Sequence, residues 1–270
     1  MIMTLDKILI VGFGKMAQAM LDGWLASGIP ASRFAIYHPR RSAAPAGIAL
    51  HNQWPDEHFD AVLLAVKPQI LGDIAPGLEP LLGPDTVLIS VLAGVTLAGL
   101  AQKFPRAGGI ARLMPNLAVA LRKSPNALAA RGLDDVQRQE LTQLAAVLGS
   151  AEWLEDESQF NLVTALAGSG PGFVFRFIDA LAGGAAELGL DRTQADRLAI
   201  AMVEGASALA ASSEYSAAEL ASRVASKGGM TQKGLDVLDD GAALQNLLRQ
   251  CLQAARDRGV EMAEMAGDKG

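Results

Sequence analysis

The chain has 270 residues, half of them hydrophobic, which is enough for two ordinary domains with buried cores. Its single cysteine, Cys251, excludes an intramolecular disulfide framework and a cysteine-cluster zinc site, and we expect no bound metal. The formal net charge of −6 argues against a general nucleic-acid surface and fits a cytoplasmic protein. No apolar run is long enough to span a bilayer, and Asp6 precedes the first short run, so neither a membrane segment nor a signal peptide is expected.

Short apolar runs recur through the N-terminal half. A strand buried on both faces of a parallel sheet has a continuous hydrophobic sequence rather than an alternating one. Segments able to form helices lie between several of the runs, and strands that alternate with helices form right-handed βαβ units. The pattern predicts an α/β fold that begins with a Rossmann-like doubly wound parallel sheet. The runs are Lys7–Val11, Phe34–His38, Asp60–Val66 and Asp85–Val91, and the helical segments include Met16–Ser27 and Gln69–Leu82.

The turn after the first run has the form G-x-G-x-x-A, which is typical of dinucleotide-binding proteins. In this motif the first glycine permits a tight turn, the second lets a pyrophosphate approach the backbone, and a small third residue lets the helix pack on the strand. The helix that follows offers free N–H groups and a positive dipole end to the phosphates. Ordinary strand–helix turns also use small residues, but the position between a buried strand and a helix favours a nucleotide site. The residues are Gly12, Phe13, Gly14, Lys15, Met16 and Ala17.

The end of the second run indicates which dinucleotide is bound. An NAD-selective site usually has an acidic residue there, which binds the ribose 2′-hydroxyl. The sequence instead reads HPRRS over residues 38–42, without an acid. A guanidinium group suits a 2′-phosphate, so Arg40 and Arg41 predict NADPH as the preferred cofactor, with NADH weaker. The alternative is that both arginines are ordinary solvated surface residues.

The run Asp60–Val66 ends in Ala65 and Val66, and Lys67 and Pro68 follow it. Proline at the first helical position fits the start of a helix. Lys67 is expected at the carboxyl edge of the sheet, where open α/β folds bind ligands. An ordinary exposed loop lysine explains this position equally well.

After Trp153 the alternation of strands and helices gives way to helix-forming sequence. We therefore expect a cofactor-binding domain over residues 1–155 and an all-α domain over residues 156–270. Because Leu198–Ala211 is apolar on more than one face, this domain is expected to bury surface against a second subunit. Helical spacing is found in Phe173–Leu188, Thr193–Ala211 and Ala242–Met265.

Glycine-rich segments interrupt the helical half twice. One is AGSGPGF over residues 167–173, and the other is SKGGMT over residues 226–231. In the second, Gly228 and Gly229 end one helix, and Met230 and Thr231 begin the next. Free backbone N–H groups at such a helix start bind a carboxylate well, and glycine lets the ligand approach the backbone. The alternative is a plain helix–turn–helix with a glycine C-cap.

The motifs GFGKMA, AVKPQ, LMPN, AGSGPGF and SKGGMT follow one another in this order along nearly the whole chain. The combination resembles pyrroline-5-carboxylate reductase. The resemblance implies reduction of a cyclic imino acid, 1-pyrroline-5-carboxylate, to L-proline with NADPH, the last step of proline biosynthesis. It also implies a Rossmann domain followed by an all-helical domain that dimerises, with rings of dimers in some members.

The resemblance also implies roles for individual residues. Gly12–Ala17 would hold the pyrophosphate, and Asn52 with Ala65–Pro68 would line the ribose and nicotinamide side. Ser226 and Gly228–Thr231 would hold the substrate carboxylate, with the Thr231 hydroxyl close to the imine nitrogen. Hydride transfer is the chemistry of the cofactor, and the imine gains its proton from solvent, so we expect Thr231 to orient the substrate rather than to act as an acid.

Several positions depart from the pattern usual in this family. Lys227 stands where proline is usual, Met230 where a small residue or threonine is usual, and Ala225 where a hydroxyl residue is common. Leu117-Ala118 replaces Thr-Pro after LMPN, and Ala167 replaces the commoner serine. The glycine pair and the threonine after it are kept, so the predicted carboxylate site is intact.

Two further functions remain open at this stage. A related β-hydroxyacid dehydrogenase or imine reductase would share the architecture and act on a different substrate. Oxidation of an alcohol needs a base, and Lys227 or Lys233 would then be the candidate. A non-catalytic NADPH-binding regulator would bind the cofactor without turnover.

Overall fold

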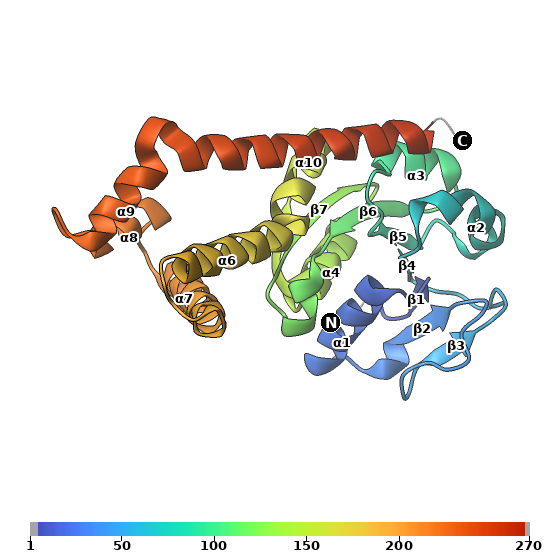
Figure 1. Cartoon of the computed structure of the whole chain (residues 1–270). Helices are drawn as coiled ribbons and strands as arrows, with labels where there is room; N and C mark the ends of the chain where they lie inside the picture. Colours follow the sequence, from blue (N-terminus) through green and yellow to red (C-terminus); the bar gives the residue numbers. More distant parts are fainter. Residues whose placement is uncertain (1–4, 268–270) are drawn as a thin grey trace. The chain divides into compact units, whose positions relative to one another are not determined.

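The computed structural model describes residues 5–267 of the chain. It contains two compact units, which are described one at a time (Figure 1). The first runs to Ser169 and includes the chain from Ala254 onward, and the second is Gly170–Gln253. The sequence predicts a boundary between functional domains at residues 155 and 156. The compact units are defined by contacts and do not test that boundary, which stays a prediction.

The first unit is built on an eight-stranded sheet with the strand order β3-β2-β1-β4-β5-β6-β7-β8. The order reverses between β1 and β4, as in a doubly wound fold. All neighbouring strands are parallel except β6 and β7. The strands are β1 (Ile8–Val11), β2 (Phe34–Tyr37), β3 (Ala49–His51), β4 (Ala61–Leu64), β5 (Val87–Ser90), β6 (Gly109–Met114), β7 (Ser124–Arg131) and β8 (Gly149–Trp153).

The antiparallel pair β6–β7 differs from the parallel sheet that the sequence predicts. Residues 115–123 connect these strands, which is shorter than the dozen or so residues that a parallel crossover needs. The chain therefore turns back, and β7 and β8 run opposite to the other strands. The segments that form β3, β6, β7 and β8 were not among the predicted strands, because they are short or because Gly, Pro, Asn or Arg interrupts their apolar residues.

Helices cover both faces of the sheet. Successive residues of each central strand enter opposite cores: Ile8 and Ile10 pack against α1 and α4, whereas Leu9 and Val11 pack with the residues of α2, α3 and α5. This burial on both faces explains the continuous apolar runs. The helices are α1 (Lys15–Ala26), α2 (Leu71–Leu78), α3 (Leu97–Lys103), α4 (Asp135–Ala146) and α5 (Phe160–Val163). Short turns are η1 (Ala31–Arg33), η2 (Pro68–Ile70), η3 (Glu79–Leu81), η4 (Leu117–Leu121), η5 (Glu157–Gln159) and the π-helical η6 (Thr164–Gly168).

The helix expected over Gln69–Leu82 is divided. It begins as the 3₁₀ turn η2 at Pro68, continues as α2 and ends as the 3₁₀ turn η3. Pro76 inside α2 and Pro80 in η3 lack a backbone N–H, so regular α-helical hydrogen bonding is interrupted along this segment.

The second unit is entirely helical, as the sequence predicts. Helices α6 and α7 pack on each other around Ala182, Ala195 and Ala199, which are the buried hydrophobic residues of this unit among those described. Many large apolar side chains of the unit are exposed, including Phe175 and Phe177. A unit with so little core needs a further surface to pack against. Its helices are α6 (Gly170–Glu187), α7 (Arg192–Ser212), α8 (Ala217–Val224), α9 (Met230–Asp239) and the first part of α10 (Ala243–Gly267), with the turn η7 (Asp240–Ala242) before α10.

Within residues 5–267, no helix is both long enough and apolar enough to cross a membrane.

Candidate functional site

The glycine turn after β1 has the geometry that the dinucleotide motif requires. Gly12 has φ +85°, in the left-handed region that favours glycine. A Cβ on Gly12 would lie 2.7 Å from Val66 Cγ1 and 2.8 Å from the Ala65 carbonyl oxygen, so no side chain fits. The structure thus brings together two of the predicted cofactor segments, one after β1 and one after β4.

The start of α1 is open toward solvent. Gly14 is the N-cap, no side chain caps the helix, and no acidic residue lies in the first turn. No atom lies within 4 Å of the position where a Gly14 Cβ would be, whereas Ala17 is buried against the sheet. Lys15 is exposed and Met16 is partly buried. The free N–H groups and the adjacent cation suit a pyrophosphate.

The segment after β2 separates the roles of the two predicted arginines. The guanidinium of Arg41 lies 4.7 Å from the ring centre of Phe13, and its Nε donates a hydrogen bond to the Ala43 carbonyl at 2.7 Å. Arg40 is exposed, and its backbone N–H donates to Nδ1 of His38 at 3.3 Å. Arg41 is therefore a fixed positive charge beside the glycine turn.

Asn52 follows the edge strand β3 and holds this arginine segment in shape. Its amide nitrogen Nδ2 donates to the carbonyl oxygens of His38 and Arg41, both at 2.8 Å. The resemblance assigns Asn52 to the ribose side of the cofactor, and these bonds add a second task. Sequence spacing gave no sign of it, because it depends on the pairing of β2 with β3.

The segment after β4 lies at the same sheet edge as the glycine turn. Ala65 donates its N–H to the Val11 carbonyl at 2.9 Å, which continues the β1–β4 pairing. Lys67 is exposed and is the N-cap of η2, and Pro68 is the first residue of that turn. Ala65–Pro68 therefore reach the carboxyl edge, where ligands bind in open α/β sheets.

The predicted substrate segment belongs to the second unit and is described by itself. Helix α8 ends at Val224, Gly228 has φ +72°, and Gly229 is the extended N-cap of α9. Helix α9 has no side-chain cap and no acidic residue in its first turn. The turn is closed by the Gly229 N–H, which donates to the Ser226 carbonyl at 2.9 Å. These features match the helix break predicted from SKGGMT.

Side chains around the start of α9 are open to solvent. Met230 is 94% exposed, and Ser226, Lys227 and Thr231 are also exposed. The open N–H groups of the first turn of α9 can bind a carboxylate, and the Thr231 hydroxyl lies on the same first turn.

The structure also adds residues that the motif analysis did not assign. Asn116, the last residue of LMPN, is buried; its Nδ2 donates to the Ala167 carbonyl at 2.9 Å, and its Oδ1 accepts from the Ala118 N–H at 2.8 Å. It thereby joins LMPN to AGSGPGF through the π-helical turn η6. The order of the motifs alone could not show this contact.

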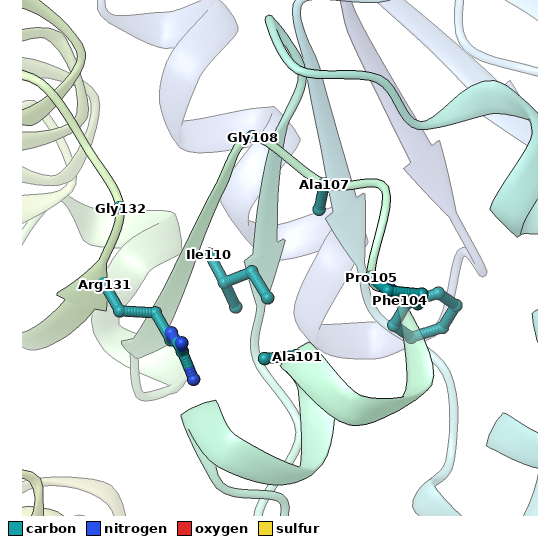
Figure 2. A pocket seen from close by; sticks show the side chains of 8 residues that line it. All are labelled: Ala101, Phe104, Pro105, Ala107, Gly108, Ile110, Arg131 and Gly132. Atoms are coloured by element: carbon teal, nitrogen blue, oxygen red, sulfur yellow. The ribbon is translucent and has the colours of Figure 1, made fainter.

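A small hollow lies at the opposite, amino-terminal edge of β6 (Figure 2). Its cavity volume is about 290 Å³, and Phe104, Ile110 and Arg131 are among the residues that line it. No predicted site residue belongs to it. Among the described residues, no cluster of three or more His, Cys, Asp or Glu side chains could hold a metal ion.

Comparison with known proteins agrees with this arrangement. Residues 157–262 match the family described as pyrroline-5-carboxylate reductase dimerisation, and residues 7–94 match the family described as NADP oxidoreductase coenzyme F420-dependent. The chain is 33% identical to pyrroline-5-carboxylate reductase of Pseudomonas aeruginosa, covering 98% of this chain and 100% of the relative. It is 34% identical to the Pisum sativum enzyme of that name, covering 91% and 92%.

A solved structure is similar over the same length. The pyrroline-5-carboxylate reductase of Coxiella burnetii has a TM-score of 0.88 and 29% sequence identity, and the match covers 96% of this chain and 99% of that one. The sequence motifs, the sheet topology and the full-length relatives agree with one another. The chain belongs to the pyrroline-5-carboxylate reductase family.

Proposed function

We propose that the protein reduces 1-pyrroline-5-carboxylate to L-proline with NADPH, the last step of proline biosynthesis. The observation that carries the proposal is the full-length relationship to the Pseudomonas aeruginosa enzyme, with the glycine pair and Thr231 kept. The single cysteine is free, which fits a cytoplasmic enzyme. In this proposal, residues 1–155 bind the cofactor, and residues 156–270 bind the substrate and dimerise.

The proposed cofactor site lies along the carboxyl edge of the sheet in the first unit. The start of α1 and Lys15 bind the pyrophosphate, and Arg41 over Phe13 binds the 2′-phosphate with help from Arg40. Ala65–Pro68 lie one strand further along the sheet, on the nicotinamide side. The bound cofactor supplies a hydride, and the protein binds and orients it.

The proposed substrate site is built on the first turn of α9. Its free N–H groups and the helix dipole bind the ring carboxylate, and exposed Lys227 adds attraction for the same charge. The Thr231 hydroxyl orients the ring nitrogen and donates a hydrogen bond as the amine forms. The amine takes its proton from water, so no acidic side chain is needed.

Purified protein is expected to oxidise NADPH rapidly when 1-pyrroline-5-carboxylate is added, and NADH more slowly. The measurement is the loss of the reduced-nicotinamide absorbance, run in parallel with both cofactors. Thr231→Ala is expected to lower kcat/KM by about tenfold or more, because a hydrogen bond made in the transition state is lost. Lys227→Met is expected to keep most of kcat, because imine reduction needs no lysine base.

Other results would contradict the proposal in distinct ways. Binding of NADPH without oxidation would support a regulator instead. Complete loss of activity in Lys227→Met with cofactor binding retained would favour a lysine-dependent hydroxyacid dehydrogenase. Unchanged kcat/KM in Thr231→Ala would remove Thr231 from the site.

Self-association is part of the proposed function, as a homodimer or a ring of dimers. The dimerisation family covers residues 157–262, and the helices of the second unit expose large apolar side chains. Phe175→Glu/Phe177→Glu is expected to lower the mass measured by light scattering to that of the monomer, because charges would have to be buried at the interface. Val136→Glu on α4 is the control, because Val136 is 47% exposed, as is Phe177. Unchanged assembly in the double variant would show that neither Phe175 nor Phe177 lies at the interface.

A further inference from the structure

A buried arginine lies near the carboxyl edge of the sheet, outside every motif used above. Arg112 is on β6 and is 3% exposed. It pairs in register with Ser90 of β5, which pairs with Leu64 of β4, which pairs with Val11 of β1. Val11, Leu64 and Ser90 are the last residues of their strands, so Arg112 stands in the row directly below the cofactor edge.

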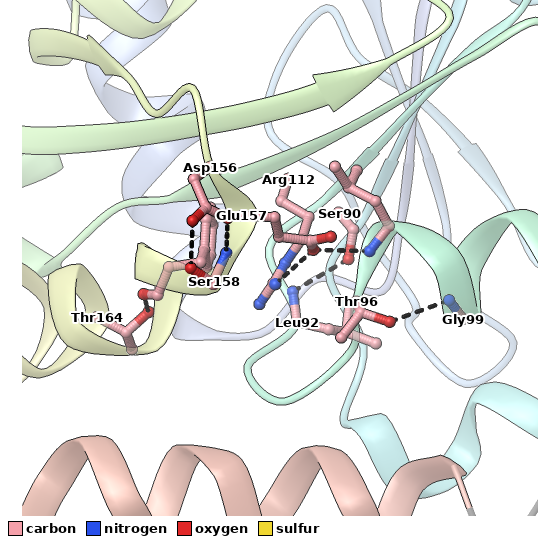
Figure 3. Close-up of polar contacts among 11 residues, drawn as sticks. Ser90, Leu92, Thr96, Gly99, Arg112, Asp156, Glu157, Ser158 and Thr164 are labelled. Carbon is pink, nitrogen blue, oxygen red and sulfur yellow. Dashed lines mark hydrogen bonds and ion pairs between the residues drawn. The ribbon is translucent and has the colours of Figure 1, made fainter.

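The guanidinium of Arg112 is held by an ion pair with Glu157, drawn in Figure 3, and by an aromatic ring. Its Nη1 lies 2.8 Å from Oε1 of Glu157, and its centre lies 3.7 Å from the ring centre of Phe160. Nε of Arg112 has no hydrogen-bond partner among the described residues. Burial lowers the pKa of Arg112 from its usual value, and the hydrogen bond and charge of Glu157 act against that shift.

Such a pair is a poor device for stability. Removing the Arg112 guanidinium from water costs free energy that the attraction of Glu157, whose side chain is 27% exposed, returns only in part, and the unpaired Nε adds to the cost. Apolar residues of similar volume would fill the space at least as well. The pair of buried Arg112 with partly buried Glu157 is better explained by what it positions.

The pair anchors one end of the loop Val91–Thr96, which joins β5 to α3. The Glu157 oxygen that binds Arg112 also accepts the backbone N–H of Leu97 at 2.7 Å, at the start of α3. At the other end of the loop, the Leu92 N–H donates to the Ser90 hydroxyl at 3.3 Å. In the middle, a Cβ on Gly94, which has φ +74°, would lie 3.0 Å from Met262 Cβ of α10.

The order of the strands indicates what this loop borders. The proposed 2′-phosphate site follows β2, the pyrophosphate site follows β1, and the nicotinamide side follows β4. The next strand in this direction is β5, and neighbouring strands lie about 4.8 Å apart. The loop after β5 is therefore the next wall of the cofactor edge, beside the nicotinamide end.

We infer that Arg112 and Glu157 are positioning residues that hold Val91–Thr96 as the wall against which the nicotinamide ring is oriented for hydride transfer. This inference rests on the proposed function. Neither side chain needs to touch the cofactor, because the effect passes through the backbone of the loop. A small displacement of a reacting group lowers the rate far more than it weakens binding.

The test compares variants of the full-length protein. The single variants Arg112→Met and Glu157→Gln each remove the ion pair, and Arg112→Lys retains the positive charge. The double variant Arg112→Met/Glu157→Gln removes both charges, so neither is left without its partner. Arg33→Met is the matched control. The Arg33 side chain is also nearly buried, at 11% exposed, and its Nη2 donates to the Leu5 carbonyl at 2.6 Å. Arg33 lies before β2, however, at the opposite edge of the sheet from the cofactor site. For each variant we would measure the thermal midpoint, the NADPH Kd, kcat, and the isotope effect on kcat with NADPH deuterated at the transferred hydrogen.

Arg112→Met and Glu157→Gln are expected to lower kcat by about tenfold or more while the NADPH Kd changes by less than about threefold. The isotope effect should rise, because hydride transfer becomes the slow step, and Arg112→Lys should recover part of kcat. Arg33→Met should lower the thermal midpoint without changing kcat or the isotope effect.

The contrary results are distinct. An inactive wild-type protein would defeat the proposed function itself. An active wild type would overturn the inference if kcat and the isotope effect in folded Glu157→Gln and Arg112→Lys match those of the wild type, whatever their thermal midpoints. The same conclusion would follow if Arg33→Met and Arg112→Met lost activity in equal proportion.

Discussion

Replacing Arg40 and Arg41 together by alanine is expected to raise KM for NADPH by about 10²-fold, because charge-assisted hydrogen bonds of about 1.5–3 kcal/mol each are lost. KM for NADH is expected to change by less than about threefold, since its ribose hydroxyl carries no charge for a guanidinium to bind. Steady-state kinetics with both cofactors at one fixed substrate concentration measures the two effects.

The single variants separate the two arginines. Arg41→Ala is expected to have the larger effect, because Arg41 is already fixed over Phe13 and by its bond to Ala43, so less side-chain entropy is lost on binding. Arg131→Ala, an exposed arginine at the other edge of the sheet, is the control and should change neither KM. Equal losses for NADPH and NADH in the double variant would show that the arginines do not bind the 2′-phosphate.

Gly229→Ala is expected to lower kcat/KM for 1-pyrroline-5-carboxylate by about 10²-fold with the NADPH Kd unchanged. A Cβ on Gly229 would lie 2.3 Å from Ser226 Oγ and 3.1 Å from the Ser226 carbonyl oxygen. The Ser226 hydroxyl must rotate away, and the contact with the Ser226 carbonyl displaces the turn by a few tenths of an ångström, which moves the N–H groups proposed to hold the substrate carboxylate. Initial rates over a range of substrate concentrations, with cofactor binding followed by fluorescence, would measure both quantities.

Gly234→Ala is the matched control on the same helix. No atom lies within 4 Å of the position of its Cβ, so the methyl group fits without displacement. Alanine in a helix interior is more stable than glycine by up to about 1 kcal/mol, so this variant should keep kcat/KM and melt no earlier than the wild type. Full activity in Gly229→Ala would mean that the carboxylate is bound elsewhere.

Parts of this protein whose signal is local could be predicted from the sequence. The run Lys7–Val11, the G-x-G-x-x-A turn and the break at Gly228-Gly229 each report on a few neighbouring residues, and the structure has a strand, a helix start and a helix end at these places. The strand β7 was missed because SPNALAAR has weak strand propensity, and its direction depends on the short connection before it.

The candidate site divides in the same way. The residues proposed to bind a ligand through their own backbone, such as Gly12, Gly14 and Gly229, stand in motifs because a side chain there would block either a neighbouring segment or the proposed ligand. The family resemblance assigned Asn52 to the cofactor site. Its hydrogen bonds to the carbonyl oxygens of His38 and Arg41 could not be predicted, because they depend on the pairing of β2 with β3. Asn116 and Arg112 act through partners far along the chain, at Ala167 and Glu157, and no spacing rule links those positions.

By itself, the sequence determined the α/β class, the cofactor turn, the helical second half and the family, because these depend on local hydrophobic periodicity and on residue types that certain backbone conformations require. Only the tertiary structure decided the reversal at β7, the fixing of Arg41 over Phe13 and the pairing of buried Arg112 with Glu157. The reversal depends on which strand β7 pairs with after its short connection, and the two arginine contacts join segments far apart in the chain, so their free energy depends on distance and burial rather than on sequence order.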